Sequence, residues 1–361
     1  MFADLTGRWC WPAHPRPLPG ELFSSWLLRS ARINRVKLTG FTALTLGDKV
    51  LLSRDMDRRL KPEVLNRLAA RTAQAPATLI ATTLSTLEGP LTRRLAPTAN
   101  TRWVLPFGLW RSGGRVSGIP FCPQCLDTGE PYYRLRWRCS FAPACKAHGT
   151  VLHGGCPHCL APALFHRLEF GPGVKNALAR TPITTCWRCQ GDLREVEGSS
   201  PASALTLWTQ GLFEDALTQG QVSLGGLPVP AIEFATVAYE LLGLLSRGTQ
   251  TAGFRTRVGE AAGVELLESG HRSRLLEALP VQDRAGVLAM LGWLLEDWPG
   301  RLVNTAHATR LSRSQFTRHL DPATVPGWYT AALEPLTTGH GRPRGQKRRT
   351  VEVTAHTVQA T

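Results

Sequence analysis

Four short pairs of metal-binding residue types follow one another between residues 122 and 189, and this spacing constrains the fold more than any other feature of the chain. Tetrahedral zinc sites are built from such pairs, because a tight knuckle lets both side chains reach one ion. Four pairs make two closed sites, so the sequence predicts two structural zinc ions (Zn2+) per chain. The pairs are Cys122 with Cys125, Cys145 with His148, Cys156 with Cys159, and Cys186 with Cys189.

The order of the pairs leaves two groupings open. In the sequential grouping, zinc 1 takes the first two pairs and zinc 2 takes the last two. In a cross-braced grouping, the first pair joins the third and the second joins the fourth, which the short gap between His148 and Cys156 does not exclude. We expect the sequential grouping, because each site then closes over a shorter loop at a lower entropy cost.

Both predicted sites would be saturated, whereas a catalytic zinc keeps an open position. The sequence has no HExxH motif and no His-x-Glu of the kind that zinc deaminases combine with CxxC. We therefore expect structural zinc and no enzyme activity. Cys139 is expected to pack as a buried thiol, and His153 and His158 are expected not to be ligands.

Helical periodicity returns on both sides of this loop-rich centre. The predicted fold class is therefore mainly α with a central double zinc-binding module. The expected parts are an N-terminal helical region at 1–105, the double zinc module at 106–197, a C-terminal helical region at 198–335, and a basic, disordered tail at 336–361.

The N-terminal region is expected to contain a first helix and then two short helices at 62–84. Pro62 and Pro76 suit first-turn positions, with a break at residues 74–75. Two short helices across a tight turn are compatible with a helix-turn-helix unit, although on pattern alone a plain helical bundle is the better-supported interpretation. The apolar face expected for the first helix consists of Leu22, Phe23, Trp26, Leu27 and Ile33.

The C-terminal region is expected to hold helices at 204–219, 231–246, 263–279 and 284–298, and then a helix-turn-helix at about 301–320. Ser312 and Gln315 form a capping box at the start of its second helix. The outward side of that helix would suit DNA contacts, although an ordinary solvated helix explains it equally well. The candidate DNA contacts are Arg313, Ser314, Thr317 and Arg318.

The charge balance favours a nucleic-acid partner. The chain has 42 Lys and Arg against 27 Asp and Glu, a formal net charge of +15, and arginine predominates among its basic residues. A GC-rich genome would explain arginine over lysine, but not the excess of base over acid. The sequence shows no membrane span and no secretory signal, which predicts a cytoplasmic protein without a membrane partner.

The central segment resembles the TniQ/TnsD family of transposon target-site selection proteins. The family pattern has a CPxCL knuckle, an acidic-Pro-Tyr stretch, an Arg-Leu-x-Trp core, a Cys-x-x-His-Gly knuckle and a CPxC knuckle, and each is found between residues 122 and 159. The stretch PLPGELFSSWLLRSA resembles the start of the family. The matching residues include Glu130, Pro131, Tyr132, Arg134, Leu135 and Trp137, and further upstream Pro19, Glu21, Ser25, Trp26 and Arg29.

The resemblance implies an adaptor. Such proteins bind target DNA or an RNA-guided CRISPR (Cascade-type) complex, recruit an AAA+ ATPase and through it the transposase, and in some relatives form homodimers. The alternative is a zinc-ribbon and helix-turn-helix transcription regulator. A metal-dependent nuclease has only RDMD as a candidate, and its two acids, Asp55 and Asp57, are expected to cap and to pair with Arg54, Arg58 and Arg59.

Overall fold

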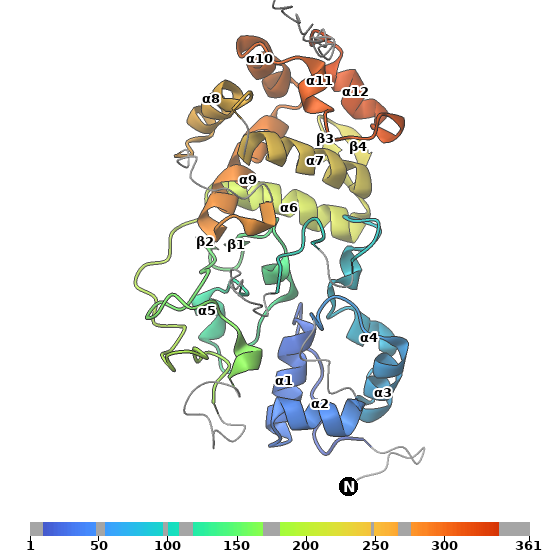
Figure 1. Cartoon of the computed structure of the whole chain (residues 1–361), viewed down its shortest axis with the longest axis vertical. Helices are drawn as coiled ribbons and strands as arrows, with labels where there is room; N and C mark the ends of the chain where they lie inside the picture. The colour runs from blue at the N-terminus through green and yellow to red at the C-terminus, as the bar shows by residue number, and fades with distance from the viewer. Residues whose placement is uncertain are drawn as a thin grey trace, which may run out of the picture.

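The chain is mainly helical, with a loop-rich central part, as the sequence predicts (Figure 1). The computed structural model describes residues 10–47, 55–96, 100–107, 118–168, 181–246, 249–265 and 276–338. The N-terminal helices lie at one end of the molecule in Figure 1, the last C-terminal helices lie at the other, and the central loops lie between. Among the described helices, none has the length and apolar character needed to cross a membrane.

The N-terminal part consists of α1 (Phe23–Ile33), α2 (Leu38–Leu46), α3 (Pro62–Thr72), α4 (Pro76–Ile80) and the 3-10 helix η2 (Leu84–Leu87). Both predicted prolines lie in the first turn of their helices. The predicted apolar face of α1 is buried except for Ile33, which is 54% exposed. That part of the prediction is wrong, because Ile33 ends the helix and the chain turns away directly after it.

The central part has little regular structure. It contains α5 (Pro123–Leu126), the 3-10 helices η3 (Leu135–Arg138) and η4 (Phe165–Arg167), and the antiparallel strands β1 (Ala144–Cys145) and β2 (Thr150–Val151). The backbone of residues 200–202 continues this hairpin on its other side: Val151 N–H donates to the Ser200 carbonyl over 2.9 Å, and Ala202 N–H donates to the Gly149 carbonyl over 2.8 Å. The segment that begins at Leu152 therefore leaves the β1–β2 hairpin and returns to it at residues 200–202.

The C-terminal part packs helices around the long pair α6 and α9, which lie side by side in Figure 1. Gly292 permits their close approach, because a Cβ atom there would clash with Thr209 Oγ1. The elements are α6 (Ala204–Gln219), β3 (Gln221–Leu224), β4 (Leu227–Pro230), α7 (Ala231–Ser246), α8 (Ala252–Ala262), η6 (Leu276–Ala278), α9 (Val281–Glu296), α10 (Gly300–Ala308), α11 (Arg313–Phe316), η7 (Pro322–Thr324) and α12 (Gly327–Leu333).

The helices predicted at 204–219 and 231–246 are confirmed at those bounds, and the one predicted at 284–298 lies within and just beyond α9. Most of the predicted helix at 263–279 lies outside the described residues, as does the tail from residue 339 on, and residues 276–278 form one 3-10 turn. Helices α8 and α12 and the β3–β4 hairpin were not predicted. The hairpin turns at Gly225 and Gly226, both with positive φ, as a type I′ turn requires.

One aromatic cluster joins the three parts of the chain. Trp103, Phe141 and Phe213 come from the N-terminal, central and C-terminal parts, and the Phe213 ring lies 4.7 Å from that of Trp103 and 5.0 Å from that of Phe141. The Tyr239 ring meets Trp103 edge-on at 5.2 Å. The proposed division at residues 105 and 197 stays a prediction, and these contacts cross both positions.

Candidate metal centres

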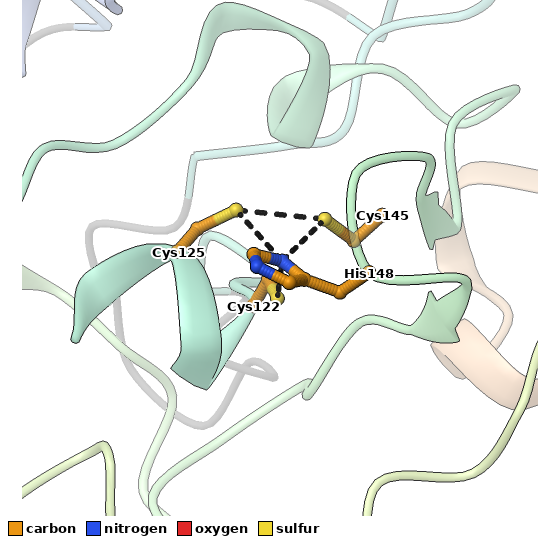
Figure 2. Close-up of side chains that lie close together, drawn as sticks. All are labelled: Cys122, Cys125, Cys145 and His148. Carbon is orange, nitrogen blue, oxygen red and sulfur yellow. Dashed lines mark hydrogen bonds between the residues drawn. The ribbon is translucent and has the colours of Figure 1, made fainter. Parts of the chain in front are cut away.

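The first cluster brings together Cys122, Cys125, Cys145 and His148, with one ligand atom of each within 4.8 Å of the others (Figure 2). The Cys125 and Cys145 Sγ atoms are 3.5 Å apart, and His148 Nδ1 lies 3.4 Å from each of the three sulfur atoms. Zinc at its usual bond lengths would give tetrahedron edges of about 3.8 Å between sulfurs and about 3.5 Å between sulfur and nitrogen. The four side chains therefore fit around one ion.

Two local structures supply these donors. Cys122 is the N-cap of the single-turn helix α5, which brings Cys125 back beside it. Cys145 ends β1, and the turn to β2 folds over it, with Gly149 N–H donating to the Cys145 carbonyl over 2.8 Å. Gly149 has a φ of +64°, a conformation that glycine adopts without a steric penalty. Figure 2 shows the two pairs facing each other, one from α5 and one from the hairpin.

The second cluster brings together Cys156, Cys159, Cys186 and Cys189. The Sγ atoms of Cys156 and Cys189 are 3.6 Å apart, and those of Cys159 and Cys186 are 3.7 Å apart. These distances match the sulfur–sulfur edges of a zinc tetrahedron and are far longer than a disulfide bond of about 2.05 Å.

Its two knuckles have the same backbone design. In each, the backbone N–H of the first cysteine donates to the carbonyl five residues later. Cys156 donates to Ala161 over 2.7 Å, and Cys186 donates to Gly191 over 2.8 Å. The residue after each second cysteine has a positive φ, +57° at Leu160 and +63° at Gln190. Each chain segment thereby turns around its cysteine pair, so that both thiols face the same point.

The structure has the sequential grouping of the pairs and not the cross-braced one. The assignment of these eight side chains to zinc stays a prediction, because the geometry shows where the donors are and not which ion they hold. The chain between the clusters makes its turn at Gly155, where a Cβ atom would lie 3.0 Å from the Leu160 carbonyl oxygen. At Gly154 a Cβ atom would lie 3.6 Å from Val281 Cγ1, which is an ordinary van der Waals contact.

The thiols of the first cluster influence one another's ionisation. Hydrogen bonds with the Cys125 and Cys145 thiols lower the pKa of Cys122 to about 3, against the opposing effect of burial. The same hydrogen bond with Cys122 raises the pKa of Cys125 well above its usual range. The Cys122 thiolate is thus stabilised by hydrogen bonds from its neighbours. A divalent cation at the centre is what would let all three sulfurs ionise together.

The second cluster contains one thiol that ionises readily. The backbone N–H of Gly191, together with hydrogen bonds from the neighbouring cysteine thiols, lowers the pKa of Cys189 to about 7, and Cys189 is exposed. Burial raises the pKa of Cys156 to about 12. Because metal binding requires thiolates, the affinity of this cluster is expected to fall as the pH falls.

The remaining cysteines and histidines of the centre lie outside both clusters, as predicted. Cys139 is fully buried, and burial raises its pKa to about 11. His153 packs its ring 6.1 Å from that of Phe121. His158 turns its Nε2 toward the Asp192 carbonyl and the Glu195 carboxylate, at 3.1 and 3.2 Å.

A buried ion-pair network near the RDMD stretch was missed at the sequence level. Arg138 donates to Asp57 Oδ2 over 2.8 Å and to Asp55 Oδ2 over 2.7 Å, and it is 1% exposed. Arg58 pairs with Asp55, as predicted. Arg59 does not: it pairs with Glu88, because its side chain points to the surface beside η2. Arg54 lies outside the described residues.

The predicted second helix of the C-terminal helix-turn-helix is shorter than expected. The capping box of Ser312 and Gln315 is present, but α11 ends at Phe316. Thr317 leaves the helical conformation, with a φ of −110° and a ψ of 4°, and Leu320 N–H donates to the Thr317 carbonyl in a separate turn, so the helix has one turn only. Thr317 and Arg318 therefore lie beyond α11, and the expectation of one helical face that carries all four candidate residues is wrong.

The four candidate DNA contacts differ in their surroundings. The Arg313 guanidinium donates to the carbonyls of Leu333 and Glu334, at 3.2 and 3.0 Å, and so closes the end of α12. Ser314 is exposed, and its hydroxyl lies 3.1 Å from that of Ser312. Thr317 is half-buried, and Arg318 is exposed and reaches Gln250 Oε1 at 3.4 Å. Their role as DNA contacts stays a prediction.

The fold and the two clusters define a mainly helical protein built around a double Cys/His metal-binding centre. Comparison with protein families adds one finding: residues 12–152 match the TniQ family. The matched segment runs from before α1 to just beyond β2. It includes the whole first cluster and ends before the second. A search of curated proteins finds no match to the chain.

Purified protein is expected to contain two zinc ions per chain, because each cluster has four donors at tetrahedral spacing. Elemental analysis after gel filtration, normalised to protein concentration, measures this number. A value of one would mean that one cluster is not a zinc site, and a value of zero would refute both assignments.

Proposed function

We propose that this protein is a non-enzymatic adaptor that selects targets for DNA transposition. The observation that carries the proposal is the TniQ domain at residues 12–152. A TniQ domain indicates a target-selection protein associated with transposition. In the proposed mechanism the chain binds and positions partners, and the cutting and joining of DNA is left to the transposase.

The two clusters would hold structural zinc, with Cys122, Cys125, Cys145 and His148 at zinc 1 and Cys156, Cys159, Cys186 and Cys189 at zinc 2. All four donors of each cluster face one point, which supports a closed site. The zinc would supply folding free energy to a central part that has only short helices and two-residue strands. Its function would be to fix the surface of this part for its partners.

The partners in this proposal are target DNA or an RNA-guided CRISPR effector complex on one side and an AAA+ ATPase on the other. The ATPase then brings in the transposase, and the chain acts in the cytoplasm, with self-association into a homodimer as a further expectation. The net charge of +15 supports a nucleic-acid partner. Arg313, Ser314, Thr317 and Arg318 remain the candidate DNA contacts of the C-terminal part.

The test is a pull-down of the tagged full-length protein with the co-encoded proteins, with and without guide RNA. We expect the ATPase to be retained, and retention of a CRISPR effector only with its guide RNA would select the RNA-guided form of the mechanism. The ATPase with an empty tag is the control. Sequence-specific DNA binding without any retained ATPase would contradict the proposal and favour a transcription regulator.

A further inference from the structure

The positive charge of the chain is distributed unevenly. Residues 1–105 contain 16 Lys and Arg against 7 Asp and Glu, a formal charge of +9. Residues 201–335 contain 10 against 13, a formal charge of −3. Nucleic-acid backbones are bound mainly through neutralisation of their phosphates. On charge alone, the N-terminal helices are therefore a better phosphate-binding surface than the C-terminal ones.

Within the N-terminal part, the stretch around α2 carries basic residues without acidic ones. Residues 22–47 contain four basic residues and no Asp or Glu. Arg35 and Lys37 form the turn between α1 and α2, and both are exposed. Arg67 of α3 is also exposed and donates to the Leu46 carbonyl at the far end of α2. Basic side chains thus stand at both ends of a nine-residue helix about 13 Å long.

Arg35 occupies a backbone position that normally selects glycine. Its φ is +57°. It follows α1 in a Schellman motif, in which Arg35 N–H donates to the Arg32 carbonyl over 2.8 Å and Val36 N–H donates to the Ala31 carbonyl over 3.0 Å. Arginine is strained in this conformation and glycine is not. Replacement of Arg35 by glycine would therefore remove the charge without disturbing the backbone of the turn.

We propose that the turn between α1 and α2, with Arg35 and Lys37, and the neighbouring Arg67 bind the phosphate backbone of duplex DNA. This inference rests on the proposed function. Arginine and lysine donate to phosphate oxygens, and the described charged residues of this surface include one exposed acid, Glu63, at the start of α3. The α2 sequence LTGFTALTL has no side chain of the bidentate base-reading types. The proposed contacts are therefore to phosphates, from the residues at the two ends of α2.

The chain contains a matched control for this turn. Helix α10 also ends in a Schellman motif with an arginine in the glycine-like position: Arg310 has a φ of +56°. Its N–H donates to the His307 carbonyl over 3.1 Å, and Leu311 N–H donates to the Ala306 carbonyl over 2.9 Å. Glycine at either position removes one charge and relieves the same backbone conformation. The Arg35 turn lies in the part of the chain with a formal charge of +9, and the Arg310 turn lies in the part with a formal charge of −3.

The experiment measures binding of a random-sequence 30-base-pair duplex by the zinc-loaded full-length protein over a series of KCl concentrations. The test variant is Arg35→Gly with Lys37→Gln, and the control is Arg310→Gly with Arg257→Gln, which removes the same number of charges at exposed positions of the C-terminal part. We expect the test variant to lose about tenfold in affinity near 0.1 M KCl and its log–log salt slope to become shallower by about 1.8. The control should stay within about twofold of the wild type.

Thermal melting separates these effects from misfolding, because neither glycine replacement should lower the melting temperature. A loss of affinity in the control variant as large as that in the test variant would overturn the assignment to the α1–α2 turn. The assignment would also be overturned if the test variant bound the duplex as tightly as the wild type does. The proposed function would then still stand. A wild-type protein that does not bind the duplex at low salt would refute both this surface and the direct-DNA form of the proposed function.

Discussion

Replacement of Cys156 by serine is expected to reduce the zinc content from two ions to one per chain and to unfold the second cluster. Cys156 is 1% exposed, and its Sγ lies 3.6 Å from that of Cys189. A neutral serine hydroxyl is a poor substitute for a thiolate ligand. Structural zinc binding is worth about 10 kcal/mol or more in small zinc modules, so loss of one ligand removes a large share of the local stability.

The measurements are elemental zinc analysis and thermal melting of the full-length protein. Transposition activity with the co-encoded proteins is expected to be lost as well, since the central part would no longer present a fixed surface. Cys139→Ser is the matched control: it makes the same sulfur-to-oxygen exchange at a fully buried cysteine outside both clusters. It should keep both zinc ions and most of the activity. Equal effects of the two replacements would show that the ligand assignment is wrong.

Replacement of Arg138 by leucine is expected to destabilise the protein by about 3–5 kcal/mol, as removal of one partner from a buried ion pair generally does. Arg138 is the shared cation of two buried acids, Asp55 and Asp57, and it also donates to the Leu105 carbonyl over 3.1 Å. Without it, the two acids would be left close together in a site from which water is excluded.

The ionisation of the two acids explains the size of this effect. Burial opposes the ionisation of Asp55, but Arg138 and Arg58 outweigh it and lower its pKa. Burial raises the pKa of Asp57 to about 6, although Arg138 and the Ser24 N–H favour its charged form. The loss of Arg138 would raise the pKa of both acids, and the cost of the buried charges would appear as lost stability at neutral pH.

Chemical denaturation at pH 7 measures the difference. Arg59→Leu is the control, because it removes a surface ion pair, that with Glu88, which is expected to contribute about 1 kcal/mol or less. Asp57→Asn added to Arg138→Leu should restore part of the loss by removing one buried charge. An Arg138→Leu protein as stable as the Arg59→Leu protein would show that the network contributes little.

The parts of the structure that the sequence predicted are those determined by short spacings. The two-residue spacing of Cys122 and Cys125 predicts a tight turn that holds both thiols. The spacing of apolar residues predicts the whole of helices α6 and α7. The capping box at Ser312 is also local and was predicted. The grouping of the four pairs followed from loop length alone, because neighbouring pairs in the sequence are also neighbours in space.

The parts that could not be predicted depend on contacts between distant segments. Arg138 meets Asp55 and Asp57 more than 80 residues away in the sequence, and nothing in RLRWRC marks it as their partner. The end of α11 at Phe316 was not predicted either: the Phe316 carbonyl accepts a hydrogen bond from the Tyr329 hydroxyl of α12 over 3.1 Å, a contact that no local pattern indicates. The conformation of Arg35 was hidden for another reason: a positive φ is expected of glycine, and the sequence has arginine there.

The closure of the chain at residues 149–151 and 200–202 has a consequence for how such a protein diversifies. The second cluster lies wholly within the segment between residues 151 and 200. Backbone hydrogen bonds join the entry and exit points of this segment to each other. The TniQ match ends at that entry point, at residue 152. The buried residues of this segment pack against the rest of the chain, as Phe165 does against Tyr133, so only its exposed residues, such as Leu160 and Arg188, can change without disturbing that packing. The exposed residues of this segment can therefore change and contact a different partner protein while the rest of the fold is kept.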